Sequence, residues 1–307
     1  MSFDINGWIK GKITPLFEEI KPIKNDGCIT SPGNMWSLKK EVALHLYIPS
    51  YYNIIKNHFK NWYYFDPFCG SGLFEFTKHS ILKGEKFPGS PIIALAHKEK
   101  YPFHQYFLSD KSKNNTNALN SRIKKLYNLD IGIETFDFTS SIKSVEHIDD
   151  RTGYDSCLAV IDPVGYAVIP WTDMERLLKI KTCDLFIVVM TNDLHRNLSA
   201  ALNPEQNDDK GLTNFLGNDS WKNCETGDDI VKKYRQQISN FGRYTEIINV
   251  NRIGENKIYD IILSTRSLGG MNVMKGISEK LQQVTTEKIQ SQAISGSGKI
   301  KPLDEYC

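Results

Sequence analysis

Residues 63–72 read Tyr-Tyr-Phe-Asp-Pro-Phe-Cys-Gly-Ser-Gly, and this stretch decides the fold. An aromatic run of the kind favoured in β-strands ends in an acid, a proline and a glycine turn, which predicts a buried strand and a tight loop. In an open α/β sheet such a loop lies at the carboxyl end of the strand, where ligands bind. Gly70 and Gly72 allow positive φ and a close approach of the backbone to a ligand. The alternative is a strand that ends in an ordinary turn.

The loop lacks two common nucleotide-binding motifs. A dinucleotide fingerprint needs a third glycine where Glu75 stands, and a phosphate-binding P-loop needs a Gly-Lys-Ser/Thr ending that this loop does not have. The later run Gly-Ser-Gly-Lys at 296–299 follows no strand and precedes Ile300. A ligand with a nucleoside but no phosphate remains, such as S-adenosylmethionine. Residues 66–72 are similar to motif I of amino-group DNA and RNA methyltransferases.

The composition indicates an ordinary globular chain. It has 307 residues, 40% of them hydrophobic and 24% charged, enough for one large α/β domain or for one domain with insertions. The net charge of +2 permits a nucleic-acid partner without requiring one. No apolar run reaches membrane-spanning length, the first residues lack signal-peptide features, and the six cysteines form no pair with metal-ligand spacing. We therefore expect a cytoplasmic protein with reduced thiols, without a membrane segment or a metal site.

The sequence predicts three regions. Residues 1–60 form an N-terminal helical segment packed on the core, with one helix over 36–47 and a second over 50–59, separated by Pro49. Lys39 and Lys40 are expected on the solvated face of the first helix. Residues 61–285 form the main domain, and residues 286–307, rich in Ser and Gly near 295, form a flexible tail.

Strands alternate with helices along the main domain. Apolar runs predict strands at 105–110, 131–136, 156–162 and 183–190, with helices at 90–96, 115–127 and 171–180. This alternation predicts a mostly parallel, Rossmann-like sheet with helices on both faces. Residues 194–227 are polar and irregular and are predicted to form an insertion. Helices are expected at 228–241 and 271–284, and strands at 244–251 and 257–265 form a C-terminal antiparallel hairpin through 254–256.

Three polar residues near strand ends are candidate cofactor contacts. Ser90 precedes Pro91 at a predicted helix start, where free N–H groups suit the carboxylate of a methionine moiety. Asp110 ends the second strand, where a carboxylate accepts hydrogen bonds from ribose hydroxyls. Asp137 ends the third strand and is placed to bond an adenine amino group. Otherwise these residues are helix caps or turn residues.

A second constellation, Asp-Pro-Val-Gly-Tyr at 162–166, follows the fourth strand. Methyl transfer to nitrogen requires the amino lone pair to face the methyl group, so acceptors for both amino hydrogens are needed. Asp162 and the carbonyl of Pro163 supply them, and Tyr166 can stack on a flipped base. Amino methyltransferases carry [DNS]-P-P-[YFW] here, whereas Val164 and Gly165 replace the second proline and move the aromatic residue by one position. The alternative is a strand-end turn in which Asp162 caps a helix.

Taken together, the chain resembles the three-Cys-motif partner proteins. The resemblance runs from about residue 36 to residue 275 and rests on residues 64–72, 89–95, 161–166 with Trp171, and 259–265. It implies a class I methyltransferase-like fold and a separate protein partner that carries the cysteines after which the family is named.

We therefore predict an S-adenosylmethionine-dependent methyltransferase that acts on an amino group of DNA or RNA. The alternative is a non-catalytic binding or scaffold protein that works with a partner. The expected cofactor contacts are Asp66, Pro67, Phe68, Gly70, Ser71, Gly72, Ser90, Asp110 and Asp137, and the expected acceptor contacts are Asp162, Pro163 and Tyr166.

Overall fold

The computed structural model describes residues 4–77, 81–148, 154–203, 210–252 and 257–298. Its centre is a seven-stranded sheet in the order β6-β5-β2-β7-β8-β10-β9. Neighbouring strands are parallel except where β10 meets β8 and β9. The strands are β2 (Asn61–Asp66), β5 (Gln105–Ser109), β6 (Ile133–Glu134), β7 (Asp155–Ile161), β8 (Cys183–Val189), β9 (Tyr244–Asn251) and β10 (Lys257–Thr265). The predicted Rossmann-like sheet with an antiparallel C-terminal strand is thus confirmed, although β6 is shorter than expected.

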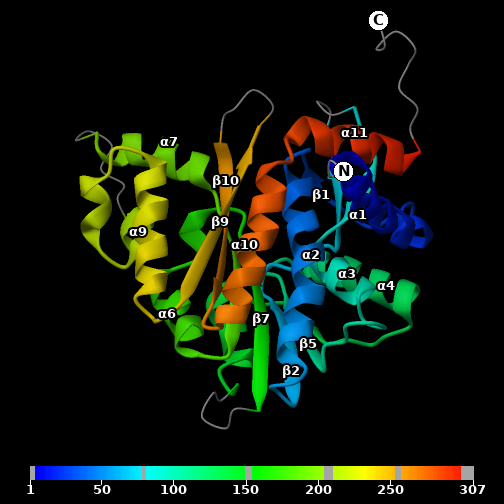
Figure 1. Cartoon of the computed structure of the whole chain (residues 1–307), viewed down its shortest axis with the longest axis horizontal. Helices are drawn as coiled ribbons and strands as arrows, with labels where there is room; N and C mark the ends of the chain where they lie inside the picture. The colour runs from blue at the N-terminus through cyan, green and yellow to red at the C-terminus, as the bar shows by residue number, and fades with distance from the viewer. Residues whose placement is uncertain (1–3, 78–80, 149–153, 204–209, 253–256, 299–307) are drawn as a thin grey trace, which may run out of the picture.

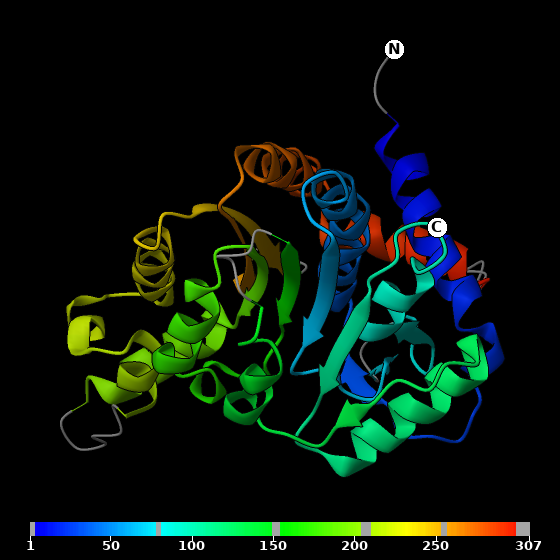
Figure 2. The ribbon, with the colours of Figure 1, turned by 90° about the horizontal axis from the view of Figure 1, so that it is seen from below.

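Helices cover both faces of the sheet because its central strands are apolar on both sides. Leu158 and Val160 of β7 belong to one hydrophobic core, and Ala159 and Ile161 belong to the other. α10 and α2 lie over the same face (Figures 1 and 2). The helices of that face are α1 (Ile5–Glu19), α2 (Ser37–Ile55), α3 (Ser90–Ala96), α4 (Lys113–Tyr127), α10 (Leu268–Gln282) and α11 (Thr286–Ser297). The opposite face carries α5 (Phe138–Ser141), α6 (Trp171–Lys179), α7 (Thr191–Ala201), α8 (Lys210–Leu216) and α9 (Gly227–Ser239).

A small second sheet, which the sequence did not predict, adjoins the glycine loop. It joins β1 (Ser31–Gly33), β3 (Leu73–Phe76) and β4 (Lys86–Pro88) in the order β1-β3-β4. A Cβ added to Gly33 would lie 2.0 Å from the Phe74 ring, so only glycine fits this strand against β3. The sheet therefore brings the N-terminal segment beside the loop that follows β2.

The predicted helix break at Pro49 is wrong, because α2 continues through it from Ser37 to Ile55. An internal proline removes one hydrogen bond and costs about 3 kcal/mol. Val42 lies before the proline, and Ile48 and Tyr51 lie around it, all within the same core. The burial of these side chains offsets the hydrogen bond lost at Pro49, because tertiary packing contributes more to helix stability than local propensity does.

Residues 194–227 are not an irregular loop. They include most of α7, all of α8 and a 3₁₀ turn at Asp219–Asn223. Leu212, Phe215 and Trp221 are each at most 1% exposed, and their burial explains why this polar segment becomes ordered. Whether the segment is an insertion remains a prediction, and residues 204–209 lie outside the described residues.

Residues 286–297, which the sequence assigns to a flexible tail, form the helix α11. This helix packs on α1, and it buries Ile289 and Ala293 in the core that also contains Ile13. The first and last helices therefore lie side by side (Figures 1 and 2). Residues 299–307 of the predicted tail and the hairpin turn at 254–256 lie outside the described residues. The domain limits at 60 and 285 remain predictions.

Candidate functional site

A cavity of about 570 Å³ lies at the carboxyl ends of β2, β5 and β7. This is the edge of a parallel sheet at which α/β proteins bind ligands. All the predicted site residues except Asp66 and Tyr166 line it. The N-terminal segment adds Ser31, Pro32, Ser37, Lys40 and Glu41 to the wall.

The glycine loop adopts a backbone that side chains rarely permit. Gly70 has φ of 58° and Gly72 has φ of 82°. A Cβ at Gly72 would also lie 2.6 Å from Cδ1 of Leu119 on α4. The hydroxyl of Ser71 donates to the carbonyl of Leu73 at 2.9 Å, which keeps this side chain within the loop. The loop thus presents backbone to the cavity.

Arg122 anchors this loop from behind, a role that the sequence did not reveal. Its side chain is fully buried, and its Nη1 donates to the Ser71 carbonyl at 2.6 Å. Its Nε and Nη2 donate to the two carboxylate oxygens of Asp26 at 2.8 and 3.2 Å, and Nη2 also reaches the Cys28 carbonyl. Arg122 therefore ties α4, the glycine loop and the N-terminal segment together. In the sequence, Arg122 stands beside Lys124 and Lys125 in a predicted helix, and no local pattern distinguishes it from those lysines.

Asp66 lies beneath the cavity, not in its wall. It is fully buried and accepts hydrogen bonds from the Ser90 hydroxyl at 2.6 Å, the Phe68 N–H at 3.2 Å and the Tyr64 hydroxyl at 3.3 Å. Burial raises the pKa of Asp66 to about 7, although the bond from Ser90 opposes the rise. Ser90 is not the N-cap as predicted, because Gly89 holds that position and Ser90 begins the helix. The pair therefore fixes α3 against the loop.

Asp110 joins the ends of two neighbouring strands. Its Oδ2 accepts from the Gly70 N–H at 3.1 Å, and its Oδ1 accepts from the Ser112 N–H at 2.8 Å and from Asn115 Nδ2 at 3.1 Å. These bonds hold the carboxylate at the cavity wall beside the glycine loop. A carboxylate has about four lone-pair positions, so one remains for a ligand hydroxyl.

Aromatic side chains form the far end of the cavity. The rings of Phe68 and Phe138 stack with centroids 5.4 Å apart, and Phe136 is 39% exposed. Asp137 caps α5 by accepting the Ser140 N–H at 2.9 Å, and this bond lowers the pKa of Asp137. Asp137 thus lines the cavity and also plays the capping role named as its alternative.

Lys40 reaches Asp162 across the cavity, which contradicts the expected solvated position. Its Nζ forms an ion pair with Oδ2 of Asp162 and lies 3.3 Å from Oε1 of Glu41. Burial opposes the charge, but the two carboxylates outweigh it and raise the pKa of Lys40. Lys39 is not solvated either: it is 7% exposed, and burial lowers its pKa to about 8. The pattern Lys-Lys-Glu gave no sign of these contacts.

Tyr166 faces away from the cavity. It is 9% exposed, and its ring meets that of Phe215 on α8 with centroids 5.7 Å apart. It lines a separate cavity together with Asp193 and Arg196. Val164, which is 80% exposed, lies at the candidate site from the same turn. The aromatic residue stands one position later here than in the pattern of amino methyltransferases. Its ring therefore packs into the core on the opposite face of the sheet.

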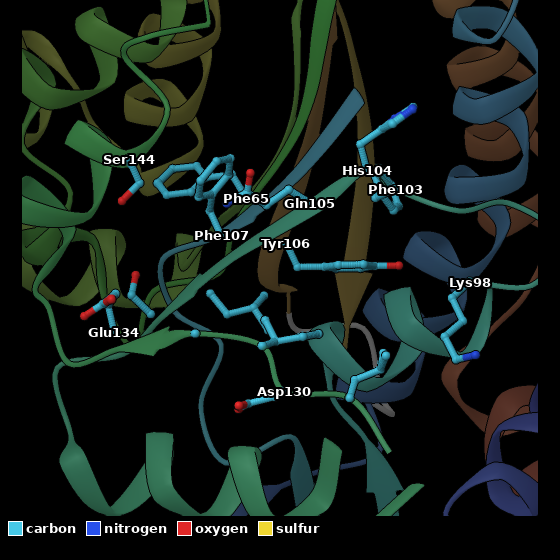
Figure 3. Close-up of a pocket in the computed structure, with 15 residues that line it drawn as sticks. Phe65, Lys98, Phe103, His104, Gln105, Tyr106, Phe107, Asp130, Glu134 and Ser144 are labelled. Carbon is cyan, nitrogen blue, oxygen red and sulfur yellow. The ribbon is translucent and has the colours of Figure 1, made fainter. Parts of the chain in front are cut away.

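A second cavity of about 690 Å³ runs along β5 (Figure 3). Tyr106 and Phe107 project to opposite sides of the strand there, and His104, Lys98 and Asp130 lie around the rim. None of the predicted site residues lines it. We therefore assign the candidate site to the smaller cavity, where the glycine loop and the strand-end acids meet.

Two kinds of site are not found in the part of the chain that the structure describes. No group of three or more His, Cys, Asp or Glu residues there is arranged to hold a metal ion. None of the described helices combines the length and hydrophobicity needed to cross a bilayer.

Comparisons with known proteins support the fold. No protein-family model matches the sequence, and no curated protein is significantly similar to it. The chain is similar in structure to protein LPL1258 from Legionella pneumophila, of the DUF519 family, with a TM-score of 0.50 at 12% identity over 80% of this chain and 94% of that one.

Two weaker similarities are to methyltransferases. The DszA carbon methyltransferase has a TM-score of 0.39 at 14% identity over 69% of this chain and 48% of that one. Trm1 from Pyrococcus horikoshii, in complex with S-adenosyl-L-methionine, has a TM-score of 0.37 at 10% identity over 76% and 58%. The strand order, the antiparallel strand β10 and the first similarity show a Rossmann-like fold.

Proposed function

We propose that this protein is an S-adenosylmethionine-dependent methyltransferase that acts on an amino group of nucleic acid. One observation carries the proposal: the glycine loop, Asp110 and Asp162 follow three neighbouring strands and line a single cavity. In this proposal, a nucleoside site lies next to a site for an acceptor nitrogen.

The residues present suit the cofactor. Gly70 and Gly72 keep side chains out of the loop, so the backbone is open to the methionine part. Asp110 has hydrogen-bonding capacity for one ribose hydroxyl, and the exposed ring of Phe136 offers an apolar surface for adenine. Asp66 and Ser90 support the loop from below, and Asp137 stands at the adenine end.

Bound S-adenosylmethionine supplies the methyl group, and the protein orients the acceptor. The Lys40 ammonium holds Oδ2 of Asp162, which leaves Oδ1 to accept one amino hydrogen. The Pro163 carbonyl is proposed to accept the other. Orienting the lone pair in this way lowers the barrier by several kcal/mol without a strong base. In this arrangement Tyr166 supports the turn through Phe215, and Val164 takes its place at the cavity.

The acceptor and partner follow from the sequence. This chain is similar to amino methyltransferases of nucleic acids in motif I, and it carries their Asp-Pro-Pro-aromatic turn in altered form at 162–166. The resemblance to three-Cys-motif partner proteins adds a separate protein partner that carries cysteines. Both are proposals, as is a cytoplasmic location.

Calorimetric titration with S-adenosylmethionine and S-adenosylhomocysteine tests the cofactor site. Wild-type protein should bind both with micromolar affinity, and Asp110→Ala should weaken both about tenfold through loss of the ribose hydrogen bond. Asp130→Ala, an exposed acid at the other cavity, is the matched control and should bind as wild type does. With an acceptor found among DNA and RNA oligonucleotides, Asp162→Ala should abolish transfer and leave binding of the neutral S-adenosylhomocysteine nearly unchanged. A folded protein that binds neither ligand would refute the proposal.

A second candidate function is a binding or scaffold protein that retains the cofactor fold. The observations that favour it are the ion pair that already occupies one oxygen of Asp162 and the turned-away ring of Tyr166. Cofactor binding without transfer to any DNA or RNA acceptor, with the partner protein present, would select this function.

A further inference from the structure

The floor of the candidate cavity has more acids than bases. Glu41 from α2, Asp66 at the end of β2 and Asp162 after β7 converge there. They lie close enough for the charges of Asp162 and Asp66 to raise the pKa of Glu41. Among the described residues, the cation in ion-pair contact with these carboxylates is Lys40. With all four groups ionised, the floor carries two uncompensated negative charges.

The hydrogen bonding of these carboxylates is unequal. Asp66 accepts three bonds, as described above. Glu41 is 2% exposed, its Oε1 lies 3.3 Å from Lys40, and its buried Oε2 has no partner among the described residues. An unsatisfied buried carboxylate is costly and is normally retained only with a compensating cation or proton. Glu41 also lines the cavity.

We propose that this floor is a site for a positively charged group, and that Glu41 makes the cavity prefer the sulfonium of S-adenosylmethionine over the neutral thioether of S-adenosylhomocysteine. This inference rests on the proposed function and extends it to how substrate and product cofactors are distinguished. In a partly desolvated site, opposite charges a few ångströms apart attract far more strongly than in water. Loss of the positive charge after transfer then favours release of the product cofactor.

Burial is the main cause of the raised pKa of Glu41, and titratable groups on four elements face it. Lys40 lies on its own helix, Asp66 and Tyr64 lie on β2, Asp162 follows β7, and Tyr259 lies on β10. The pKa values of both tyrosines are raised, so they stay neutral, and Lys40 stays charged. The pKa of Glu41 is raised to about 7. A bound cation therefore favours the carboxylate, and the Glu41 proton passes to the buffer when the cation binds near pH 7.

The test compares both ligands by calorimetry at pH 6 and pH 8, for wild type and Glu41→Gln. In wild type, raising the pH should strengthen S-adenosylmethionine binding about tenfold relative to S-adenosylhomocysteine binding. In Glu41→Gln, the preference at pH 8 should fall about tenfold and should change less with pH than in wild type, because Asp66 still titrates near pH 7. Each ligand is measured with both wild type and Glu41→Gln. Any pH dependence that comes from titration of the ligand itself is therefore the same for both proteins and cancels in the comparison. Glu134→Gln, an exposed acid lining only the other cavity, should behave as wild type.

Proton release provides a second readout, should Glu41→Gln fail to fold. Titrations of wild type at pH 7, in buffers that differ in ionisation enthalpy, should show proton release with S-adenosylmethionine beyond that with S-adenosylhomocysteine. Equal release with both ligands, or equal weakening of both by Glu41→Gln, would overturn the inference while leaving the cofactor site intact. Failure of wild type to bind either ligand would instead overturn the proposed function together with the inference.

Discussion

Gly72 meets two separate restrictions, a φ of 82° and the close approach of Leu119. We predict that Gly72→Ala lowers the free energy of unfolding by about 2–4 kcal/mol, because left-handed strain and overpacking add. Urea denaturation measures the loss. Gly84→Ala is the matched control, since Gly84 has φ of 78° but no atom within 4 Å of an added Cβ, and it should lose only about 1 kcal/mol. Equal losses would mean that Leu119 yields and that only the strain matters.

At the same scale, the sequence predicted the residues that end strands and missed those that reach across the fold. Asp110 and Asp162 could be placed because the carboxyl ends of parallel strands share one edge. The Lys40–Asp162 ion pair joins residues 122 positions apart, and no local pattern encodes such a contact. Tyr166 was misplaced because one inserted position changes the face on which a side chain emerges.

Arg122 connects α4, the glycine loop and the N-terminal segment, so its removal should destabilise all three. Burial alone would raise the pKa of Asp26, but the hydrogen bonds from Arg122 outweigh it and lower this pKa. We predict that Arg122→Met lowers the free energy of unfolding at pH 7 by about 3–5 kcal/mol, because Asp26 and the Ser71 carbonyl lose a buried partner. It should also weaken cofactor binding by loosening the glycine loop. Chemical denaturation and calorimetry measure the two effects.

The control for this element-scale change is Arg176→Met. Arg176 also pairs with two acids, Glu146 and Asp173, but its side chain is 26% exposed, so the loss should stay below about 1 kcal/mol. The difference between the variants should shrink as the pH falls, because Asp26 is protonated as the pH drops through its lowered pKa. A difference that persists unchanged at acidic pH would show that Arg122 acts through its packing and its bonds to the Ser71 and Cys28 carbonyls, and not through Asp26.

Whole elements were predicted where periodicity was strong and missed where packing overrides composition. The central strands and the helices between them appear close to their predicted positions. The helices within residues 194–227 and α11 were missed because their buried residues are sparse in a polar sequence, and their order comes from the surfaces they cover. The continuous α2 shows the same effect at Pro49. Local propensity is a weak guide in such segments.

Across the whole molecule, the buried carboxyls near the cavity should make stability depend on pH. The pKa values of Asp66 and Glu41 are both raised to about 7 in the folded protein, mainly by burial. The folded state then holds more protons than the unfolded state between about pH 4 and pH 7, so stability falls as the pH rises through this window. We predict that the free energy of unfolding decreases by about 5 kcal/mol between pH 5 and pH 8.

Urea denaturation of wild type at pH 5, 6, 7 and 8 checks this slope. Glu41→Gln removes one of the two groups, so its curve should be flatter, and Glu134→Gln should follow wild type. Saturating S-adenosylmethionine should stabilise the protein more at pH 8 than at pH 6, because a cation compensates the carboxylates only once they are ionised. A wild-type stability that rises from pH 5 to pH 8 would mean that the cavity floor is already neutralised in the free protein, and the cavity would then have no charge with which to attract a cofactor.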